Sequence, residues 1–181
     1  DDSSSSHSGM TGMDHGSGSM TSTTPAKAGD VDGAFVSQMI PHHQMAVQMA
    51  KNAKSTGEHT EIKSLADEII SAQASEITQL EGIAKRIGVT PAAMGAQDQM
   101  MSDAETLGLS MDEMGMSMNM DMLMDAKPFD RAFIDMMIPH HQGAIRMARA
   151  QLSKGTDPEL KKLATAIVSA QTKEINQMNS W

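Results

Sequence analysis

The chain has 181 residues, enough for one domain with a substantial core, and it carries a net charge of −9 and no Cys. This charge argues against nucleic acid and anionic membrane surfaces as partners, and the lack of Cys excludes disulfides and thiolate metal ligands. The 20 Met residues stand beside only three Phe, one Trp and no Tyr. A core with so few aromatic residues must be built from aliphatic residues and Met, which favours helices over strands.

Residues 1–29 are rich in Ser, Gly and Thr and predict a disordered tether. Residues 30–181 are expected to form a single helical-bundle domain. The tether also contains soft-metal ligands, which are His7, Met10, Met13, His15 and Met20. Composition supports weak metal capture and a plain solvated tail about equally. An N-terminal lipid anchor is compatible with it, and a chain that starts at Asp1 is expected of a processed product.

Residues 32–87 form the first helical unit. Apolar residues recur every three or four positions on both sides of a stop signal at Thr56-Gly57, which predicts two antiparallel helices. Pro41 lies inside the first pattern and predicts either a kink or the true start of that helix. In either case the carbonyl four residues earlier loses its helical hydrogen-bond partner.

Residues 88–127 form an acidic, Met-rich connection with one basic residue, Lys127. Thr90-Pro91 resembles a helix start, and Ser110 with Glu113 resembles a capping box. Beyond it, Met alternates with Asn, Asp, Ser and Gly, which makes a poor helical core stripe. We therefore expect these thioethers to serve as metal ligands rather than as filler. They are Met111, Met114, Met116, Met118, Met120, Met122 and Met124.

Residues 130–179 repeat the first unit without a gap. DGAFVSQMIPHHQMAVQMA at 32–50 aligns with DRAFIDMMIPHHQGAIRMA at 130–148, and Asp157-Pro158 marks the start of the second helix. Two such αα-hairpins can bury their apolar faces on each other. The sequence therefore predicts an all-α fold, a four-helix bundle made of two repeated hairpins with a Met-rich connecting segment.

The ligand types point to Cu(I), a soft ion that prefers thioether and imidazole donors. Residues three or four apart share a helix face, so each MIPHHQ block places Met within reach of a His pair. One such His or Met alone is as well explained by core packing, but the doubled block favours a metal site. The candidate ligands here are Met39, His42, His43, Met45, Met49, Met136, Met137, His140, His141 and Met147.

A second repeated feature lies on the following helix of each unit. Gln73 and Glu76 recur as Gln171 and Glu174, and the Gln interrupts an otherwise apolar stripe. Because a buried polar group needs a partner, one hypothesis is that Gln or Glu orients an imidazole or a neighbouring Gln. A purely structural bridge between helices is an equal alternative.

The MIPHHQ blocks, the following Gln/Glu helix and the Met-rich centre resemble a bacterial secreted family of four-helix proteins with an HHQ motif. That family was long catalogued as a domain of unknown function (DUF305-like) and is described as ferritin-like. The resemblance covers about residues 32–179 and implies a periplasmic copper-binding protein of copper resistance. It implies metal positions at Met39, His42, His43, Met49, Met137, His140, His141 and Met147. The dense Met run at 111–124 exceeds the family pattern, and Pro41 and Pro139 replace a small residue.

The predicted function is sequestration or buffering of Cu(I) outside the cytoplasm, in a periplasmic, secreted or cell-surface protein without enzymatic activity. Silver would bind wherever Cu(I) does, and imidazole admits Cu(II). Other copper-handling proteins are the expected partners. Two alternatives stay open, a ferritin-like metal-dependent oxidase and a Met-rich helical interaction module without metal. The first lacks the Glu-x-x-His pairs that such sites need.

Overall fold

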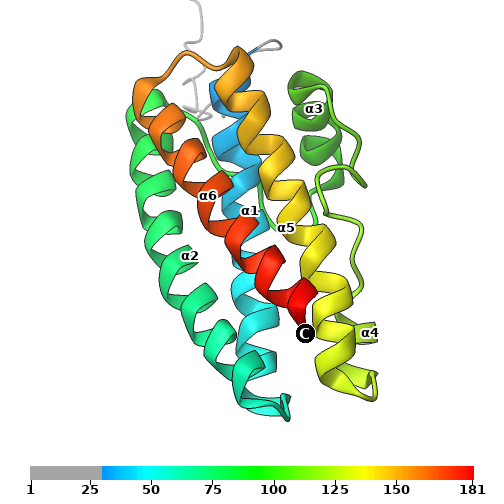
Figure 1. Cartoon of the computed structure of the whole chain (residues 1–181). Coiled ribbons are helices and arrows are strands. Elements are labelled where there is room, and N and C mark those ends of the chain that lie inside the picture. The colour runs from blue at the N-terminus through cyan, green and yellow to red at the C-terminus, as the bar shows by residue number, and fades with distance from the viewer. Residues whose placement is uncertain (1–29) are drawn as a thin grey trace, which may run out of the picture.

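The computed structural model describes residues 30–181, and the predicted tether at 1–29 lies outside them. Within the described part every regular element is a helix (Figure 1). The helices are α1 (Val31–Thr56), α2 (Thr60–Ile87), α3 (Gln97–Leu107), α4 (Met120–Asp125), α5 (Phe129–Lys154) and α6 (Pro158–Ser180). None of these helices is long and apolar enough to cross a membrane.

The four long helices form two hairpins, α1 with α2 and α5 with α6, which pack into one bundle (Figure 1). The hairpins meet chiefly along α1 and α5, while α3 packs on α1 and α4 packs on α5. The predicted all-α bundle of two repeated hairpins is thereby confirmed. Because α1 and α5 carry the MIPHHQ blocks, the fold brings the two blocks face to face in its interior.

Most helix ends lie where the sequence signals place them. Helix α1 ends at Thr56 before Gly57, and α6 begins at Pro158 after Asp157, whose carboxylate accepts from the backbone N–H of Leu160 at 3.0 Å. Thr90-Pro91 is a different case, because the helix that it predicts is absent. The segment after α2 is irregular, and α3 begins only at Gln97.

Pro41 explains why the irregular segment between α2 and α3 packs against α1. Both Pro41 and Pro139 lie inside continuous helices, so the alternative that they mark helix starts is wrong. Pro41 has no N–H to offer the carbonyl of Ser37, and that carbonyl accepts instead from the backbone N–H of Ala92 at 3.1 Å. The chain after α2 is thereby tied to α1 instead of starting a helix.

The connection is anchored to the bundle by a buried carboxylate. Asp103 of α3 accepts hydrogen bonds from Ser37 Oγ at 2.9 Å and from Gln38 Nε2 at 2.6 Å, both on α1. Gln99 Nε2 donates to its other oxygen at 3.0 Å. A buried carboxylate needs such donors, and the two bonds from Ser37 and Gln38 place α3 against the first half of α1.

The predicted capping box forms, but no helix follows it. The Ser110 backbone N–H donates to Glu113 Oε2 at 2.7 Å, and the Glu113 N–H donates to Ser110 Oγ at 3.1 Å. The chain then makes turns and reverses at Gly115, whose φ is 71°. Only glycine takes this conformation readily, and the reversal brings residues 114 and 115 onto α5.

That contact explains one departure from the repeat. Met45 of α1 corresponds to Gly143 of α5, and a Cβ built on Gly143 would lie 1.9 Å from the carbonyl oxygen of Met114. A side chain at this position would displace the backbone of the connection. The second unit therefore gives up a Met at this position and gains a contact with the Met-rich segment.

Two aspartates hold the hairpins together reciprocally. Asp32, at the start of α1, accepts from the backbone N–H groups of Thr156 at 2.9 Å and Asp157 at 3.0 Å in the α5–α6 loop. Asp130, at the start of α5, accepts from those of Glu58 at 3.0 Å and His59 at 2.8 Å in the α1–α2 loop. Each hairpin thus closes the loop of the other.

These contacts set the charge of both carboxylates. Burial alone would raise the pKa of each, but hydrogen bonds to Asp32 from Gln151, Thr156 and Asp157 outweigh it and lower its pKa. At Asp130 the hydrogen bonds from His59 and Glu58 do the same, and the charge of His59 adds to them. Both pKa values therefore lie below the ordinary value of 3.8.

We predict that Asp130→Asn lowers the free energy of unfolding by about 1.5–3 kcal/mol at pH 7, the usual range for hydrogen bonds to a charged group. A carboxyl whose folded-state pKa is depressed stabilises the fold above its unfolded pKa and loses this effect as pH falls through the folded value. The difference from wild type should therefore shrink below pH 3.8. Urea unfolding at pH 7 and pH 3 measures it. The exposed Asp98→Asn is the control, and an equal loss at both pH values would contradict the assignment.

We predict that Gly143→Ala lowers the free energy of unfolding by about 1–3 kcal/mol, the usual cost of overpacking a tight interior contact. Gly82→Ala is the matched control, because Gly82 is also helical and a Cβ added there would meet nothing within 4 Å. That variant should gain up to about 1 kcal/mol from helix propensity. Urea midpoints measure both changes. Equal stabilisation by the two substitutions would show that residues 114 and 115 do not press on α5.

Candidate metal centre

The middle of the bundle contains a cluster of polar side chains, two from each long helix. We call it the central polar cluster. Seven of its members are buried and Glu76 is half-buried. Its members are His42 and His43 of α1, Gln73 and Glu76 of α2, His140 and His141 of α5, and Gln171 and Glu174 of α6. Such a concentration is costly in a helical core unless it is paired or bound to a ligand.

Two His–Glu pairs connect the helices within each hairpin. His43 Nε2 is hydrogen-bonded to Glu76 Oε2, and His141 Nε2 is hydrogen-bonded to Glu174 Oε2. The contact that an orienting role requires is therefore present for the Glu of each pair, and a purely structural bridge between helices would make the same contact. An orienting role is not confirmed for the Gln, because Gln73 Oε1 and both amide atoms of Gln171 have no partner in the described structure.

The other two histidines stack on each other at the junction of the hairpins. The rings of His42 and His140 lie with centroids 3.7 Å apart and planes 5° from parallel. His140 Nδ1 lies 2.8 Å from the carbonyl oxygen of Gly115, and its Nε2 lies 2.9 Å from that of His42. Neither ring nitrogen of His42 makes a well-formed hydrogen bond in the described part of the chain, although the backbone carbonyl of Met114 comes close enough to favour the protonated ring. The repeat is therefore not symmetric at its centre.

Burial keeps this stacked pair uncharged. Desolvation, with a smaller contribution from the neighbouring imidazoles, lowers the pKa of His42 well below 6.5. Desolvation lowers the pKa of His140 to about 4, although its two carbonyl contacts oppose the shift. Both rings are neutral at pH 7, which is the form that binds metals. A neutral ring has one N–H, so only one of the two His140 contacts is a hydrogen bond.

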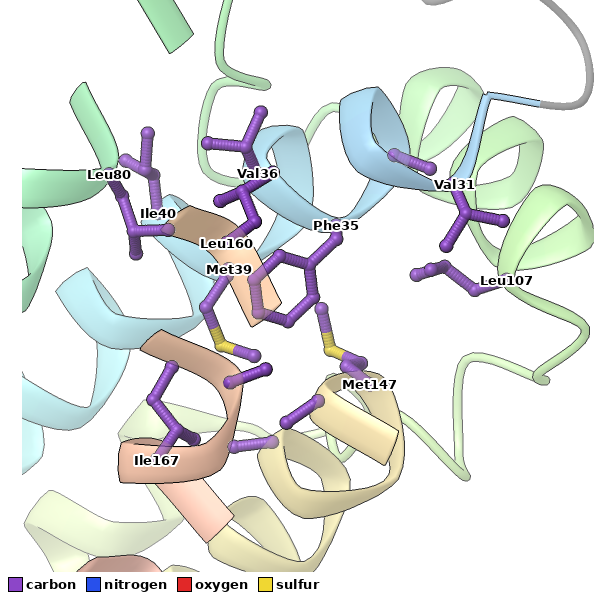
Figure 2. Packing of buried hydrophobic residues seen from close by; sticks show 14 of the residues in the cluster. Val31, Phe35, Val36, Met39, Ile40, Leu80, Leu107, Met147, Leu160 and Ile167 are labelled. Atoms are coloured by element: carbon purple, nitrogen blue, oxygen red, sulfur yellow. The ribbon is translucent and has the colours of Figure 1, made fainter. Parts of the chain in front are cut away.

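Buried thioethers flank the cluster on both sides. Met39 and Met147 lie with Phe35 in one apolar cluster, where Figure 2 shows the two side chains beside the aromatic ring. Met49 and Met137 lie in the second apolar cluster. All four methionines have 0% exposure. Each sulfur therefore packs in the core, and contact with an aromatic ring is a favourable environment for it.

The other predicted ligands fall into three groups. Met45 and Met136 on the helices, and Met111, Met118 and Met120 in the connection, are half-buried. Met122 and Met124 are exposed, at 69% and 48%. Met114 and Met116 are buried in the core. For these last two the expectation that the alternating run would not fill a core is wrong, because the turn at Gly115 folds them inward.

The structure limits the kinds of ion that suit this centre. Within residues 30–181 no group of three or more His, Asp or Glu converges to hold a metal ion. The buried side-chain atoms without partners are imidazole nitrogens and amide atoms of Gln, and the residues one turn from the His pairs on α1 and α5 include methionines. This donor set suits a soft ion of low coordination number better than Mg²⁺ or Ca²⁺, which need several oxygens.

Sequence reasoning missed several residues that shape the centre. Gly115 and Gly143 decide how the connection meets His140, and the signal for them was the replacement of Met45 by Gly143, one of several differences between the repeats. His140 was predicted as a ligand. Both of its nitrogens face backbone carbonyls, so that role remains a prediction that requires one contact to open.

Comparison with known proteins agrees with this architecture. The family model described as "Domain of unknown function (DUF305)" matches residues 1–84 and 32–181. Among curated proteins, an uncharacterized protein of Acanthamoeba polyphaga mimivirus is 45% identical over 51 residues, which are 28% of this chain. The match spans only 34% of the length of that relative.

Solved structures extend the likeness over most of the chain. CopM in its Cu(I)-bound form is 35% identical, with a TM-score of 0.68 over 83% of this chain and 94% of CopM. CopM in its Cu(II)-bound form is 36% identical over the same shares, also with a TM-score of 0.68. A candidate secreted DUF305 protein from Streptomyces coelicolor is 25% identical, with a TM-score of 0.71 over 83% of this chain and 91% of that one. The chain therefore belongs to the DUF305 family.

Proposed function

We propose that this protein binds copper as Cu(I) and sequesters it, using methionine and histidine side chains of the duplicated α1 and α5 helices. The observation that carries the proposal is the bundle centre, where buried and partly unpartnered imidazoles lie between two pairs of fully buried methionines. Thioether sulfur and neutral imidazole are the donors that Cu(I) prefers. Ring nitrogens that no protein group engages are what a ligand-binding centre requires.

The proposal assigns different roles to buried and exposed thioethers. The buried sulfurs of Met39, Met49, Met137 and Met147 would hold the ion, because the packed bundle excludes competing water. The exposed Met122 and Met124 would capture it first, assisted by the acidic charges around them. Thioethers have no proton to lose, so this capture would persist in acidic surroundings.

The structures of CopM support copper as the bound metal and suggest that related ions bind as well. CopM has been obtained in Cu(I)-bound, Cu(II)-bound and silver-bound forms, and this chain resembles each over 83% of its length. We infer that silver competes for the same sites here, since Ag(I) shares the softness of Cu(I). Cu(II) would rely more on the imidazoles and on the carboxylates of Glu76 and Glu174.

We also propose that the protein works outside the cytoplasm. Its sequence has no Cys and 20 Met, which suits an oxidising compartment where thiols oxidise readily and thioethers persist. The Streptomyces coelicolor relative is described as a candidate secreted protein. Together these features favour buffering or resistance in the periplasm, at the cell surface or in the medium, in exchange with other copper-handling proteins.

Anaerobic titration with Cu(I) against a chromogenic chelator tests the proposal. We expect several Cu(I) equivalents per chain to be withdrawn from the chelator, with little response to Mg²⁺ or Zn²⁺ in parallel titrations. Failure to compete for Cu(I) would leave a Met-rich helical interaction module as the better description.

Methionine-to-leucine variants separate the two classes of thioether. Leucine conserves volume and costs less than about 1.5 kcal/mol at a core position, so Met39→Leu with Met147→Leu should still fold. We expect this pair to weaken the tightest Cu(I) equivalent by at least about tenfold, which corresponds to ~1.4 kcal/mol. The exposed pair Met122→Leu with Met124→Leu is the control and should keep that affinity. An unchanged affinity in the buried-pair variant, with native circular dichroism, would remove these sulfurs from the site.

A further inference from the structure

Two buried histidines are each held by a carboxylate through one ring nitrogen only. His43 uses Nε2 toward Glu76, and His141 uses Nε2 toward Glu174. A carboxylate accepts hydrogen bonds and has none to donate when ionised. With the carboxylate ionised, each Nε2 carries the proton that makes the bond. The repeat supplies this arrangement twice, once in each hairpin.

The opposite ring nitrogen is left without a partner in both residues. Nδ1 of His43 and Nδ1 of His141 are buried and have no hydrogen-bond partner in the described structure. If either ring carried a second proton, it would be a buried N–H donor with no acceptor, which costs the full desolvation of that group. The tautomer with hydrogen on Nε2 leaves a lone pair on Nδ1 instead, which is ready for a ligand.

From this geometry we propose that Glu76 and Glu174 are positioning residues that keep the proton of His43 and His141 on Nε2, and so present Nδ1 of each imidazole as the atom that binds Cu(I). The inference deepens the proposed copper binding and rests on it. A carboxylate behind a ligating imidazole fixes both the tautomer and the ring orientation and makes the ring a stronger donor.

The position of Nδ1 selects the sulfur that can join it. Nδ1 is the ring nitrogen nearer the backbone, and helical side chains lean toward the N-terminal turn. Met39 stands four residues before His43, and Met137 stands four before His141, so each shares a helix face with its histidine. Both sulfurs are fully buried. The inference therefore pairs Met39 with His43 and Met137 with His141, once in each repeat.

The stacked pair lacks this carboxylate-held arrangement, although the nitrogens of His42 are also without a well-formed hydrogen bond. Both nitrogens of His140 face backbone carbonyls, and within residues 30–181 no carboxylate is bonded to the ring of His42 or of His140. The His–Glu pairs thus form two equivalent candidate sites, while the stacked pair forms the asymmetric junction between them. The expected stoichiometry at the bundle centre is one ion for each repeat.

Long-range ¹H–¹⁵N correlation spectra of the imidazoles test the inference directly. In the apo protein we expect His43 and His141 to show protonated Nε2 and unprotonated Nδ1. Ag(I), a diamagnetic and air-stable probe, should then shift the Nδ1 resonances of both residues and the methyl signals of Met39 and Met137. Protons on Nδ1 in the apo protein, or silver-induced shifts centred on Nε2, would overturn it.

Isosteric variants add a functional measurement. Glu76→Gln introduces an amide that can donate to Nε2 and so permits the wrong tautomer, and we expect an approximately 10–100-fold loss of affinity for Cu(I) at that repeat. Glu174→Gln should do the same at the other. Glu81→Gln, exposed on α2, is the control and should change nothing. A merely structural role would lower stability in urea while leaving the tautomer and the Nδ1 shifts unchanged, and that result would contradict the inference.

The two proposals fail in distinguishable ways. If neither Cu(I) nor Ag(I) changes any Met or His signal, copper binding itself is wrong and the positioning role falls with it. If metal binds and shifts Met signals but the Nδ1 resonances of His43 and His141 stay in place, copper binding stands and the role of the two glutamates is wrong.

Discussion

The constraint on which the structure depends is the burial of four imidazoles at the centre of a helical bundle. Each must be paired, stacked or available to a ligand, because an isolated buried polar group is costly. Glutamates on α2 and α6 satisfy one nitrogen of each outer ring, and a backbone carbonyl satisfies one nitrogen of His140. The nitrogens that remain unpaired are the ones from which a soft ion would gain most. The same few imidazole nitrogens must therefore either make hydrogen bonds within the protein or bind a metal ion.

The duplication explains why these atoms occur twice, and the connection explains why the copies differ. Reciprocal contacts from Asp32 and Asp130 are preserved between the hairpins. The turn at Gly115 then reaches one copy only, placing a carbonyl on His140 and requiring glycine at position 143. One inserted segment thus converts a symmetric set of four histidines into two equivalent outer rings and an unequal central pair.

Much of the fold could be read from the chain, because its signals are local. The three-and-four periodicity, the stop at Gly57 and the cap at Asp157 each depend on neighbouring residues, and the helices end there. The missing helix at Thr90-Pro91 depended on a carbonyl freed by Pro41, which lies on another helix far away in the sequence. The burial of Met114 likewise depended on a turn that packs on α5. Periodicity within the segment carries no information about such long-range partners.

The candidate site likewise has features that the local sequence predicts and features that depend on distant parts of the chain. The histidines and the flanking methionines follow from the repeated MIPHHQ block, whose spacing places them on one helix face. The pairing of His43 with Glu76 was open from sequence, because a Gln stood beside the Glu and either could have made the contact. Which imidazole nitrogens stay free could not be foreseen, since it depends on carbonyls contributed by Gly115 and by the facing helix.

The reciprocal Asp contacts have a consequence for the architecture as a whole. In an isologous dimer each subunit supplies to the other the same contact that it receives. Asp32 and Asp130 do this within one chain, each closing the opposite loop through backbone N–H groups. The molecule is therefore built as a fused pseudo-dimer, whose halves find their relative register through their own ends. The connection at 88–127 contacts the two halves unequally. It thereby breaks the twofold relation between them at His42 and His140.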